Sequence, residues 1–434
     1  MFLYRKFLFI LTGLFFLSHC YFQQFWNGDS DSSGNDNEIN PESEYRNSYY
    51  THSQINEKLV SFINSYPTIC RQEVIGYSEE NREIKALKIS DNVNLDETEP
   101  AVRLLADIHG DEKLSGEILL RLIEYVLLNY SVNSKITNIV NNLEIYCVVT
   151  VNPDGLENIK NGTRSSIRYN ANYVDLNRNF ASSWQPGTYH GTSAFSEAES
   201  LAIKALHEKE YFSSGLDLHT GSFCLTYLLD SVARDKIIEE FGYNYYLTYY
   251  LPDDEYIVEL ADNFIKLVNL KNFKKTNGGD WYIINGSIPE WSYESFGCIV
   301  YTVEMNHEKQ SEFNFNKEKY KYGNIYTYES LDELIDERFY LFKTALIDYL
   351  DKSRYGLSGI ISDAGSNLPI GARIQIQGYK YEILSSVNNG FFHRMLKSGE
   401  YNLTVKAEGY QEKRIHNILI KENETAFISI MLNK

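Results

Sequence analysis

Short apolar runs alternate with longer amphipathic runs over most of the chain. Runs with the length of buried strands cover 102–108, 144–151, 215–218 and 299–303. Runs with apolar residues at helical spacing cover 51–66, 115–129, 196–208, 257–268 and 331–350. Strands that alternate with helices predict an α/β fold, and strands that are apolar throughout predict a sheet covered on both faces.

The pattern changes near residue 353. From there to the end, apolar and polar residues alternate in short runs such as 373–376 and 401–405, separated by turn-forming Asn, Ser and Gly. About 80 residues of this pattern predict a small all-β sandwich over 355–434. The α/β domain is expected over 48–352.

Residues 1–20 have the shape of a secretory signal peptide. Two basic residues precede an apolar run over 7–17, and polar residues follow it up to Cys20. Even 7–22 gives only 16 residues, fewer than the roughly 20 that a membrane-spanning helix needs. We therefore expect no transmembrane span and predict export, to the medium, the periplasm or the cell surface.

Two further features belong to this region. The residues before Cys20 resemble a bacterial lipobox, with His19 where a small residue is usual, so a lipid anchor at Cys20 is the alternative to an ordinary cleaved signal. The segment 21–47 is rich in Asp, Glu, Ser, Gly and Asn and is expected to be an acidic, flexible linker.

Composition limits the chemistry. The 434 residues are 43% hydrophobic and 23% charged, which is typical of a globular protein. The formal net charge of -18 opposes contact with phosphate backbones, so we expect no nucleic-acid partner. The five cysteines are at least 50 positions apart, which excludes a cysteine zinc site and a CxxC redox motif and leaves disulfide pairing open. Any metal would be bound by His and carboxylate side chains.

Residues able to bind a metal or carry protons follow each of the four predicted strands. The segments after the strands begin, in chain order, with His109-Gly110-Asp111-Glu112, Asn152-Pro153-Asp154-Gly155, His219 and Glu304. Open α/β sheets bind their ligands at the carboxyl ends of the strands. We therefore expect these four strand ends to meet at one crevice.

Two histidines and one glutamate of this set have the composition of a catalytic zinc site, which leaves a fourth position for water. His109 and Glu112 are three positions apart in a turn, and His219 follows a different strand. Each has a structural interpretation by itself. Glu112 suits a helix N-terminus beside a surface histidine, and His219 suits a hydrogen-bonded strand end.

A second polar segment surrounds two arginines that are ten positions apart. Arg168 and Arg178 are interleaved with Asn residues and Asp175. A guanidinium group can bind a carboxylate through two parallel hydrogen bonds, which suits recognition of an anionic substrate. The alternative is internal pairing of either arginine with Asp175 in a structural loop.

Taken together, these motifs resemble those of the zinc metallocarboxypeptidases. The order and spacing match that family at His109-Gly110-Asp111-Glu112, Asn152-Pro153-Asp154-Gly155, Arg168, Asp175-Leu176-Asn177-Arg178-Asn179-Phe180, His219, Gly278-Gly279-x-Trp281-Tyr282, Trp291-x-Tyr293 and Glu304. The C-terminal β region resembles the transthyretin-like domain of the carboxypeptidase N/E/D group. The resemblance covers about residues 48–434 and implies a mixed, mostly parallel sheet flanked by helices, followed by a transthyretin-like β-sandwich.

The resemblance implies one Zn²⁺ bound by His109, Glu112 and His219, which is the two-His, one-Glu set of carboxypeptidase A. It also implies that Asp175 hydrogen-bonds His109. Such a carboxylate fixes the tautomer of a metal-binding imidazole and strengthens it as a ligand.

The other matching residues act on the substrate. Glu304 matches the general base, and Arg168 matches the group that stabilises the developing oxyanion. Asn177, Arg178 and Tyr282 match the clamp on the terminal carboxylate of a peptide. The implied partners are therefore the C-termini of peptides or proteins, and the chain is expected to act as a monomer.

The sequence departs from the family pattern at a few positions. Asp111 replaces the common Asn, and Glu290 stands where the family has Asp. Asp230 occupies the position of the acid that accepts a basic side chain, whereas Pro289 replaces the Gln that often assists it. We expect cleavage of C-terminal Lys or Arg if Asp230 has this role; the alternative is that Asp230 is a solvated loop residue.

The sequence thus predicts a zinc-dependent exopeptidase. A second hypothesis is a carboxypeptidase that acts on peptidoglycan stem peptides, whose terminal diaminopimelate also carries an amine. A third is a catalytically silent protein that binds C-termini. Inactive relatives usually lack a zinc ligand or the base, and this sequence retains all four residues.

Overall fold

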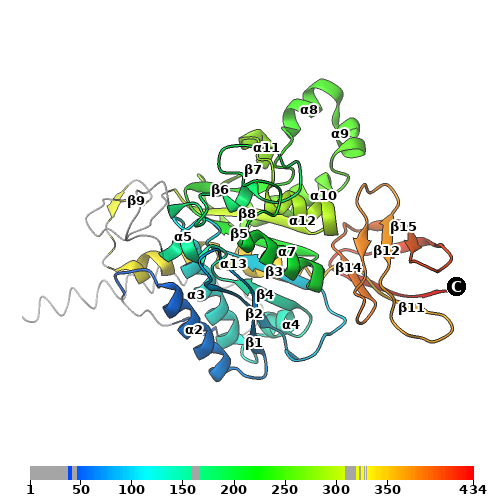
Figure 1. Ribbon diagram of the computed structural model, residues 1–434, viewed down its shortest axis with the longest axis horizontal. Coiled ribbons are helices and arrows are strands. Elements are labelled where there is room, and N and C mark those ends of the chain that lie inside the picture. The colour runs from blue at the N-terminus through cyan, green and yellow to red at the C-terminus, as the bar shows by residue number, and fades with distance from the viewer. Residues whose placement is uncertain are drawn as a thin grey trace, which may run out of the picture. The chain divides into compact units, whose positions relative to one another are not determined.

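The structure, a computed structural model, describes residues 38–41, 46–157, 167–307, 319–321, 324–326, 328 and 330–434 (Figure 1). The predicted signal peptide, the candidate lipid anchor at Cys20 and most of the predicted linker lie outside the described residues. From Glu38 to Lys434 the chain forms one compact unit.

A sheet of eight strands forms the centre of the α/β part, in the order β1-β2-β4-β3-β5-β8-β6-β7. The strands are β1 Cys70–Tyr77, β2 Glu83–Ile89, β3 Ala101–Leu105, β4 Glu144–Val148, β5 Ser214–His219, β6 Ser222–Tyr227, β7 Lys274–Asn277 and β8 Ile299–Asn306. Four neighbouring pairs are parallel and three are antiparallel. The predicted mixed, mostly parallel sheet is confirmed. A separate hairpin joins β9 Lys319–Lys321 and β10 Asn324–Tyr326.

Helices cover both faces of this sheet (Figure 1). They are α2 His52–Ser65, α3 Leu114–Asn129, α4 Ser134–Val140, α5 Pro153–Glu157, the short 3-10 helix η2 Leu176–Arg178, α7 Ala198–Glu210, α8 Arg234–Phe241, α9 Tyr243–Tyr249, α10 Asp254–Val268, α11 Gly278–Trp281, α12 Ile288–Phe296 and α13 Leu331–Lys352. Each of the five predicted helices is present, with ends that shift by a few residues.

Alternate residues of the central strands point to opposite faces, as strand geometry requires. On β3, Leu104 joins the hydrophobic cluster beneath α3, α10 and α13, while Leu105 joins the cluster beneath α7 and α12. On β8, Tyr301 and Val300 divide between the same two clusters. Continuous apolar strands are therefore needed because both faces of the sheet are buried.

The strands predicted over 102–108 and 144–151 are too long: β3 ends at Leu105 and β4 ends at Val148. The apolar residues beyond each end are buried in turns rather than paired in the ladder. In the first turn, Asp107 takes a positive φ of 50°, and its carboxylate accepts hydrogen bonds from the start of α3. The backbone therefore turns before it reaches the predicted metal-binding residues.

Seven strands follow α13 and form two further sheets. They are β11 Gly356–Asp363, β12 Arg373–Ile376, β13 Ile383–Leu384, β14 Phe391–Arg394, β15 Gly399–Lys406, β16 Lys413–Ile420 and β17 Thr425–Leu432, in the orders β14-β11-β17 and β13-β12-β15-β16. The two sheets share one hydrophobic cluster, as expected for a small β-sandwich. Arg394 of this region forms a buried ion pair with Asp253, and the Tyr381 hydroxyl donates to Glu294 of α12 at 2.6 Å.

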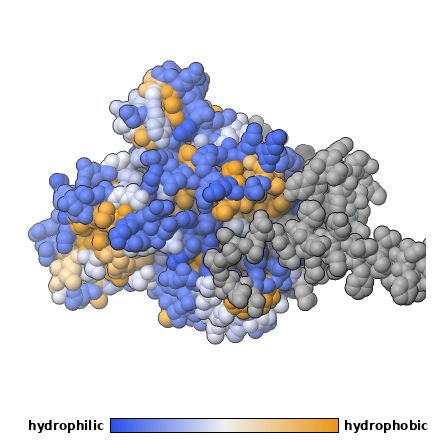
Figure 2. Space-filling model, turned by 180° about the vertical axis from the view of Figure 1, so that it is seen from behind, coloured by the Kyte–Doolittle hydropathy of each residue, from blue (hydrophilic) through white to orange (hydrophobic). Residues whose placement is uncertain are grey.

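Hydrophilic side chains cover much of the face in Figure 2, and hydrophobic side chains form separate patches on it. Within the described ranges, no helix is both long and apolar enough to cross a membrane. The four cysteines of the described residues, Cys70, Cys147, Cys224 and Cys298, are unpaired.

Candidate metal centre and active site

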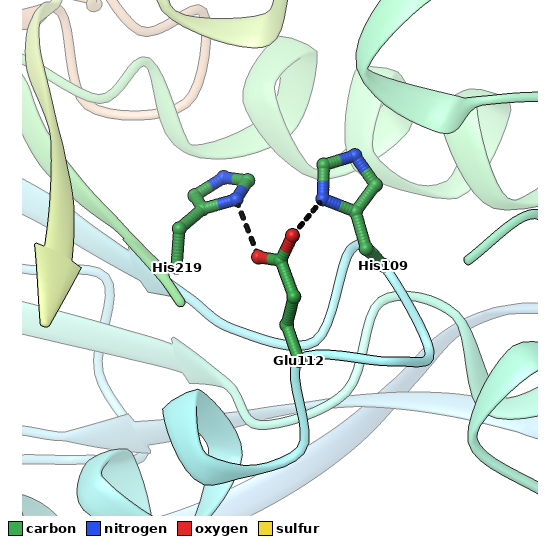
Figure 3. Close-up of side chains that lie close together, drawn as sticks. All are labelled: His109, Glu112 and His219. Atoms are coloured by element: carbon green, nitrogen blue, oxygen red, sulfur yellow. Dashed lines mark hydrogen bonds and ion pairs between the residues drawn. The ribbon is translucent and has the colours of Figure 1, made fainter. Parts of the chain in front are cut away.

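Two side chains of the turn between β3 and α3 meet one from the end of β5 at the carboxyl edge of the central sheet (Figure 3). His109 follows β3, Glu112 precedes α3, and His219 ends β5. The Glu112 carboxylate lies between the two imidazoles, with Oε1 2.8 Å from Nδ1 of His109 and Oε2 2.8 Å from Nδ1 of His219. All three side chains are buried. The structure therefore brings together the predicted zinc ligands.

Parallel pairing of β3 with β5 explains why these residues meet, because it places the ends of the two strands side by side. The turn after β3 also depends on Gly110. A Cβ atom at this position would lie 2.2 Å from the carbonyl carbon of Gly155 and 2.4 Å from the carbonyl oxygen of Ile167. Only glycine allows the backbone of the His109–Glu112 turn to pack so closely against these neighbouring segments.

The donor atoms fit a zinc ion. One ring nitrogen from each histidine and one carboxylate oxygen lie within 4.8 Å of one another, and two His with one Glu is a set that zinc commonly uses. Two other groups of three in the described ranges offer carboxylates alone. Oxygen-only groups suit harder cations, so the His109, Glu112 and His219 group is the one whose chemistry matches zinc.

A carboxylate outside this group orients one of the histidines. Oδ1 of Asp175 lies 3.1 Å from Nε2 of His109, on the opposite side of the ring from Glu112. Burial by itself would raise the pKa of Asp175, but His109 and Arg168 outweigh it and hold this pKa well below its usual range. Asp175 is therefore an anion that can fix the His109 ring with Nδ1 directed at the metal position.

The pKa values in the centre follow from its charges. Burial alone would raise the pKa of Glu112, but His109 and His219 hold it well below its usual range. Burial alone would lower the pKa of His219, but the Glu112 carboxylate raises it. The ionised carboxylate is thus the form that the two imidazoles stabilise.

Glu304 reaches the same place from the neighbouring strand. It pairs with His219 in the parallel ladder between β5 and β8, and its Oε2 accepts a hydrogen bond of 3.2 Å from the main-chain nitrogen of Ser222. Its side chain is buried but lines the cavity at the metal centre. The position suits a carboxylate that exchanges a proton with a water molecule at that centre.

Arg168 lies beside the metal centre and keeps its side chain partly exposed to the cavity. Its Nη1 donates to Glu112 Oε1 at 3.2 Å, and its Nε and Nη2 donate to Asp175 Oδ2 at 3.2 and 2.9 Å. The internal pairing considered from the sequence is therefore present. It also fixes the guanidinium at the edge of the cavity, where it can meet a substrate oxygen.

The cavity has a volume of about 160 Å³. Every predicted site residue except Asp175 lines it: His109, Glu112, Arg168, Asn177, Arg178, His219, Asp230, Tyr282 and Glu304. Several other lining residues match none of the motifs found in the sequence, namely Thr220, Gly221, Thr226, Ile284 and Thr302. Their side chains carry no distinctive chemistry, so no motif could have marked them.

One side of the cavity has the components of a carboxylate clamp. Arg178 donates through Nη1 to the carbonyl oxygen of Asn177 at 2.8 Å. Partial burial raises the pKa of Tyr282, while the hydrogen bond and the charge of Arg178 oppose this effect. Asn177 is fixed because its Oδ1 accepts from the main-chain nitrogen of Ile288 at 3.0 Å. A cation and a phenol hydroxyl thus lie together at the cavity wall.

The zinc carboxypeptidase family model matches residues 55–325, which are more than half of the chain. The chain belongs to this zinc carboxypeptidase family. Members are metallocarboxypeptidases, which are peptide hydrolases, and membership implies zinc, for which the His109, Glu112 and His219 group is the candidate site. The matched region includes all ten predicted site residues, but it ends before the C-terminal β region.

Curated relatives agree with the family. The chain is 28% identical to carboxypeptidase D of Rattus norvegicus over 369 residues, which cover 80% of this chain but 24% of that protein. It is 27% identical to carboxypeptidase SOL1 of Arabidopsis thaliana, covering 87% and 71%, and 27% identical to the carboxypeptidase N catalytic chain of Mus musculus, covering 81% and 79%. The chain thus spans about a quarter of the length of carboxypeptidase D.

Solved structures agree with the fold. Thrombin activatable fibrinolysis inhibitor superposes with a TM-score of 0.54 at 19% identity, covering 70% of this chain and 74% of that one. Carboxypeptidase A from Helicoverpa armigera gives a TM-score of 0.52 at 19% identity, covering 70% and 73%. At this level of identity the likeness concerns the fold alone.

Asp230 lines the wall of the cavity and is buried, so it is not a solvated loop residue. Its Oδ1 would lie 2.0 Å from a Cβ atom at Gly278, so the absence of a side chain there leaves room for the carboxylate. Burial and the neighbouring Glu290 raise the pKa of Asp230 to about 7. A buried acid at a cavity wall can recognise a cationic group.

Two residues at the start of α12 support Asp230 from behind the cavity wall, in a way that the sequence did not reveal. Ser287 caps α12 and also hydrogen-bonds Asp230 through its side chain. Glu290 accepts hydrogen bonds from the main-chain nitrogens of Asp230 and Ser231. Glu290, which stands where the family has Asp, therefore lies next to Asp230 in the structure, although the two residues are 60 positions apart in the sequence.

Proposed function

We propose that this chain is a zinc-dependent exopeptidase that hydrolyses the C-terminal residue of peptides or proteins. The observation that carries the proposal is the arrangement of His109, Glu112 and His219 in one cavity with Glu304 and Arg178. When bound, zinc supplies Lewis-acid polarisation of the scissile carbonyl and of the attacking water.

The side chains of this chain would do the remaining work. Glu304 takes a proton from the water that attacks the carbonyl carbon, and later gives a proton to the amine that leaves when the C–N bond breaks. Arg168 donates hydrogen bonds to the oxyanion that develops on the carbonyl oxygen. Asp175 keeps the His109 ring in place through these steps.

The clamp restricts the reaction to chain ends. Arg178, Asn177 and Tyr282 would bind the terminal carboxylate, with the Arg178 guanidinium as its positive partner. An internal peptide bond offers no free carboxylate to Arg178. The scissile bond would therefore be the last one of the chain, held between the clamp and Glu304.

The proposed substrates end in Lys or Arg. The support is the position of Asp230 at the cavity wall beside Gly278, where a long cationic side chain next to a clamped carboxylate would end. The predicted signal peptide over 1–20 further supports action outside the cytoplasm, on exported or extracellular peptides. The net charge of -18 would favour cationic peptides as a weak steering effect.

Replacement of Asp230 tests this specificity. We expect the wild-type protein to cleave matched peptides ending in Arg or Lys faster than those ending in Phe or Glu. Asp230→Asn should lower kcat/KM for the Arg peptide by about 100-fold, because a buried cation then lacks its anion, and should leave the Phe peptide within about threefold. Asp235→Asn, at an exposed aspartate of α8, is the control.

The outcomes separate the hypotheses. Equal rates on all peptides, or an unchanged Arg-to-Phe ratio in Asp230→Asn, would contradict the assignment of Asp230. Rapid release of diaminopimelate from muropeptides with slow cleavage of Arg peptides would favour the cell-wall hypothesis instead. Stoichiometric zinc without turnover on any C-terminal residue would favour a binding protein.

A further inference from the structure

Glu290 holds the main chain that carries the pocket acid. It lies in the first turn of α12 and is buried. Its Oε2 accepts hydrogen bonds from the backbone nitrogens of Asp230 at 2.8 Å and Ser231 at 2.7 Å, and its Oε1 accepts from the Ser231 hydroxyl at 2.5 Å. The hydroxyls of Ser182 and Ser183 lie 3.1 and 3.3 Å from the same oxygen. One side chain thus ties together three segments of the pocket wall.

The sequence around Glu290 explains why this residue is needed. Pro289 occupies the first turn of α12, where its missing N–H costs nothing, but it has no polar side chain to support a pocket acid. The support comes from the residues on either side, since the Ser287 side chain hydrogen-bonds the Asp230 carboxylate and Glu290 binds its main chain. The two contacts act on different parts of the same residue.

The charges around Asp230 are mostly negative. The charged groups that act on it most strongly are Glu290 of α12, Asp217 of β5 and Arg178 at the end of η2. Asp217 already forms a buried ion pair with Arg103. Arg178 is the residue that the proposed function assigns to the substrate carboxylate. Glu290 is therefore the nearby carboxylate whose charge acts on Asp230, and it is not among the residues that line the cavity.

We infer that Glu290 is a positioning residue for specificity: it fixes the Asp230 segment and holds a second carboxylate beside it, so that the pocket favours a cationic C-terminal side chain. This inference rests on the proposed role of Asp230 in Lys or Arg recognition. Glu290 acts through Asp230 and need not touch the substrate itself.

The arrangement makes recognition depend on pH. Burial and Glu290 raise the pKa of Asp230 to about 7, so below this pH Asp230 is largely protonated and must release a proton when a cationic side chain binds. The KM for an Arg peptide should therefore rise about tenfold for each unit of pH below 7, relative to the KM for a Phe peptide. The Phe peptide serves as the reference because any effect of pH on the shared catalytic groups acts on both substrates.

Two variants should move this midpoint in opposite directions. A neighbouring anion raises the pKa of a carboxyl group, so Glu290→Gln should lower the midpoint of the KM ratio by about one pH unit. A hydrogen bond to the carboxylate lowers its pKa, so Ser287→Ala should raise the midpoint. In both variants we expect kcat for the Arg peptide to remain within about threefold of the wild-type value.

The experiment measures KM and kcat for matched peptides ending in Arg and Phe between pH 5 and 9. Glu294→Gln is the control for the charge of α12, because Glu294 lies on the same helix and shares Ser182 with Glu290, but its other contact is Tyr381 rather than the Asp230 segment. Glu290→Asp keeps the negative charge, so its midpoint should be close to that of the wild-type protein. If Glu290→Gln does not fold, the upward shift in Ser287→Ala still tests the pH dependence of the pocket.

The result that overturns the inference is a wild-type midpoint in Glu290→Gln, while Asp230→Asn abolishes the preference for Arg. In that case the role of Asp230 stands and the role of Glu290 fails. If Asp230→Asn leaves the preference intact, the proposed specificity itself fails. Equal shifts of the midpoint in Glu290→Gln and Glu294→Gln would mean that the effect comes from the general charge of α12. This result would also overturn the inference.

Discussion

Glu304→Gln is expected to bind zinc normally and to lose turnover by about 10³- to 10⁵-fold. The amide has nearly the same shape as the carboxylate, but it cannot accept a proton from the attacking water or return one to the leaving amine. Glu304 pairs with His219 in the sheet without belonging to the metal-binding group, so its replacement should leave the donor atoms in place. Single-turnover rates and zinc content, measured on the same preparation, check both parts.

Glu208→Gln is a suitable control for this variant, because Glu208 is exposed on α7. It should match the wild-type protein in rate and zinc content. Near-normal turnover in Glu304→Gln would remove Glu304 from its proposed role. Loss of zinc together with loss of turnover would instead assign Glu304 to the metal site.

His219→Ala is expected to abolish both activity and stoichiometric zinc. Removal of this ring leaves the Glu112 carboxylate with one imidazole partner and leaves only two of the three proposed ligands. The affinity for zinc should fall by more than about 100-fold, whereas Asp175→Asn should lower it by only about 10- to 100-fold, because Asp175 contacts a ligand rather than the metal. Competition with a zinc-binding dye measures both affinities.

His416→Ala supplies the control for this series, since His416 is exposed on β16 far along the chain from the metal centre. We expect no change in its zinc affinity. An unchanged affinity in His219→Ala, or a larger loss in Asp175→Asn than in His219→Ala, would contradict the ligand set.

Much of this site could be predicted from the sequence because its residues follow strand ends. The apolar runs before His219 and Glu304 are buried on both faces, and such runs form central strands of a parallel sheet. Their carboxyl ends must then lie at one edge of the sheet. The positions of the candidate metal centre and of the proposed base therefore follow from the strands without knowledge of the loop paths.

The specificity pocket could not be predicted in the same way. The contacts of Glu290 with Asp230 and Ser231 join residues sixty positions apart, through a loop whose path no local pattern specifies. Only the family resemblance placed Asp230 at the position of the pocket acid, because the local pattern fits a solvated loop residue equally well, although the loop buries Asp230. Similarly, the turn at Asp107 ended β3 earlier than its apolar residues indicated.

The most direct measurement follows zinc and activity together as the metal is removed and returned. We predict one zinc per chain, loss of cleavage of an Arg peptide in proportion to the zinc removed by a chelator, and recovery with one equivalent of zinc. A protein that contains no metal and still cleaves the peptide at its full rate would contradict this prediction.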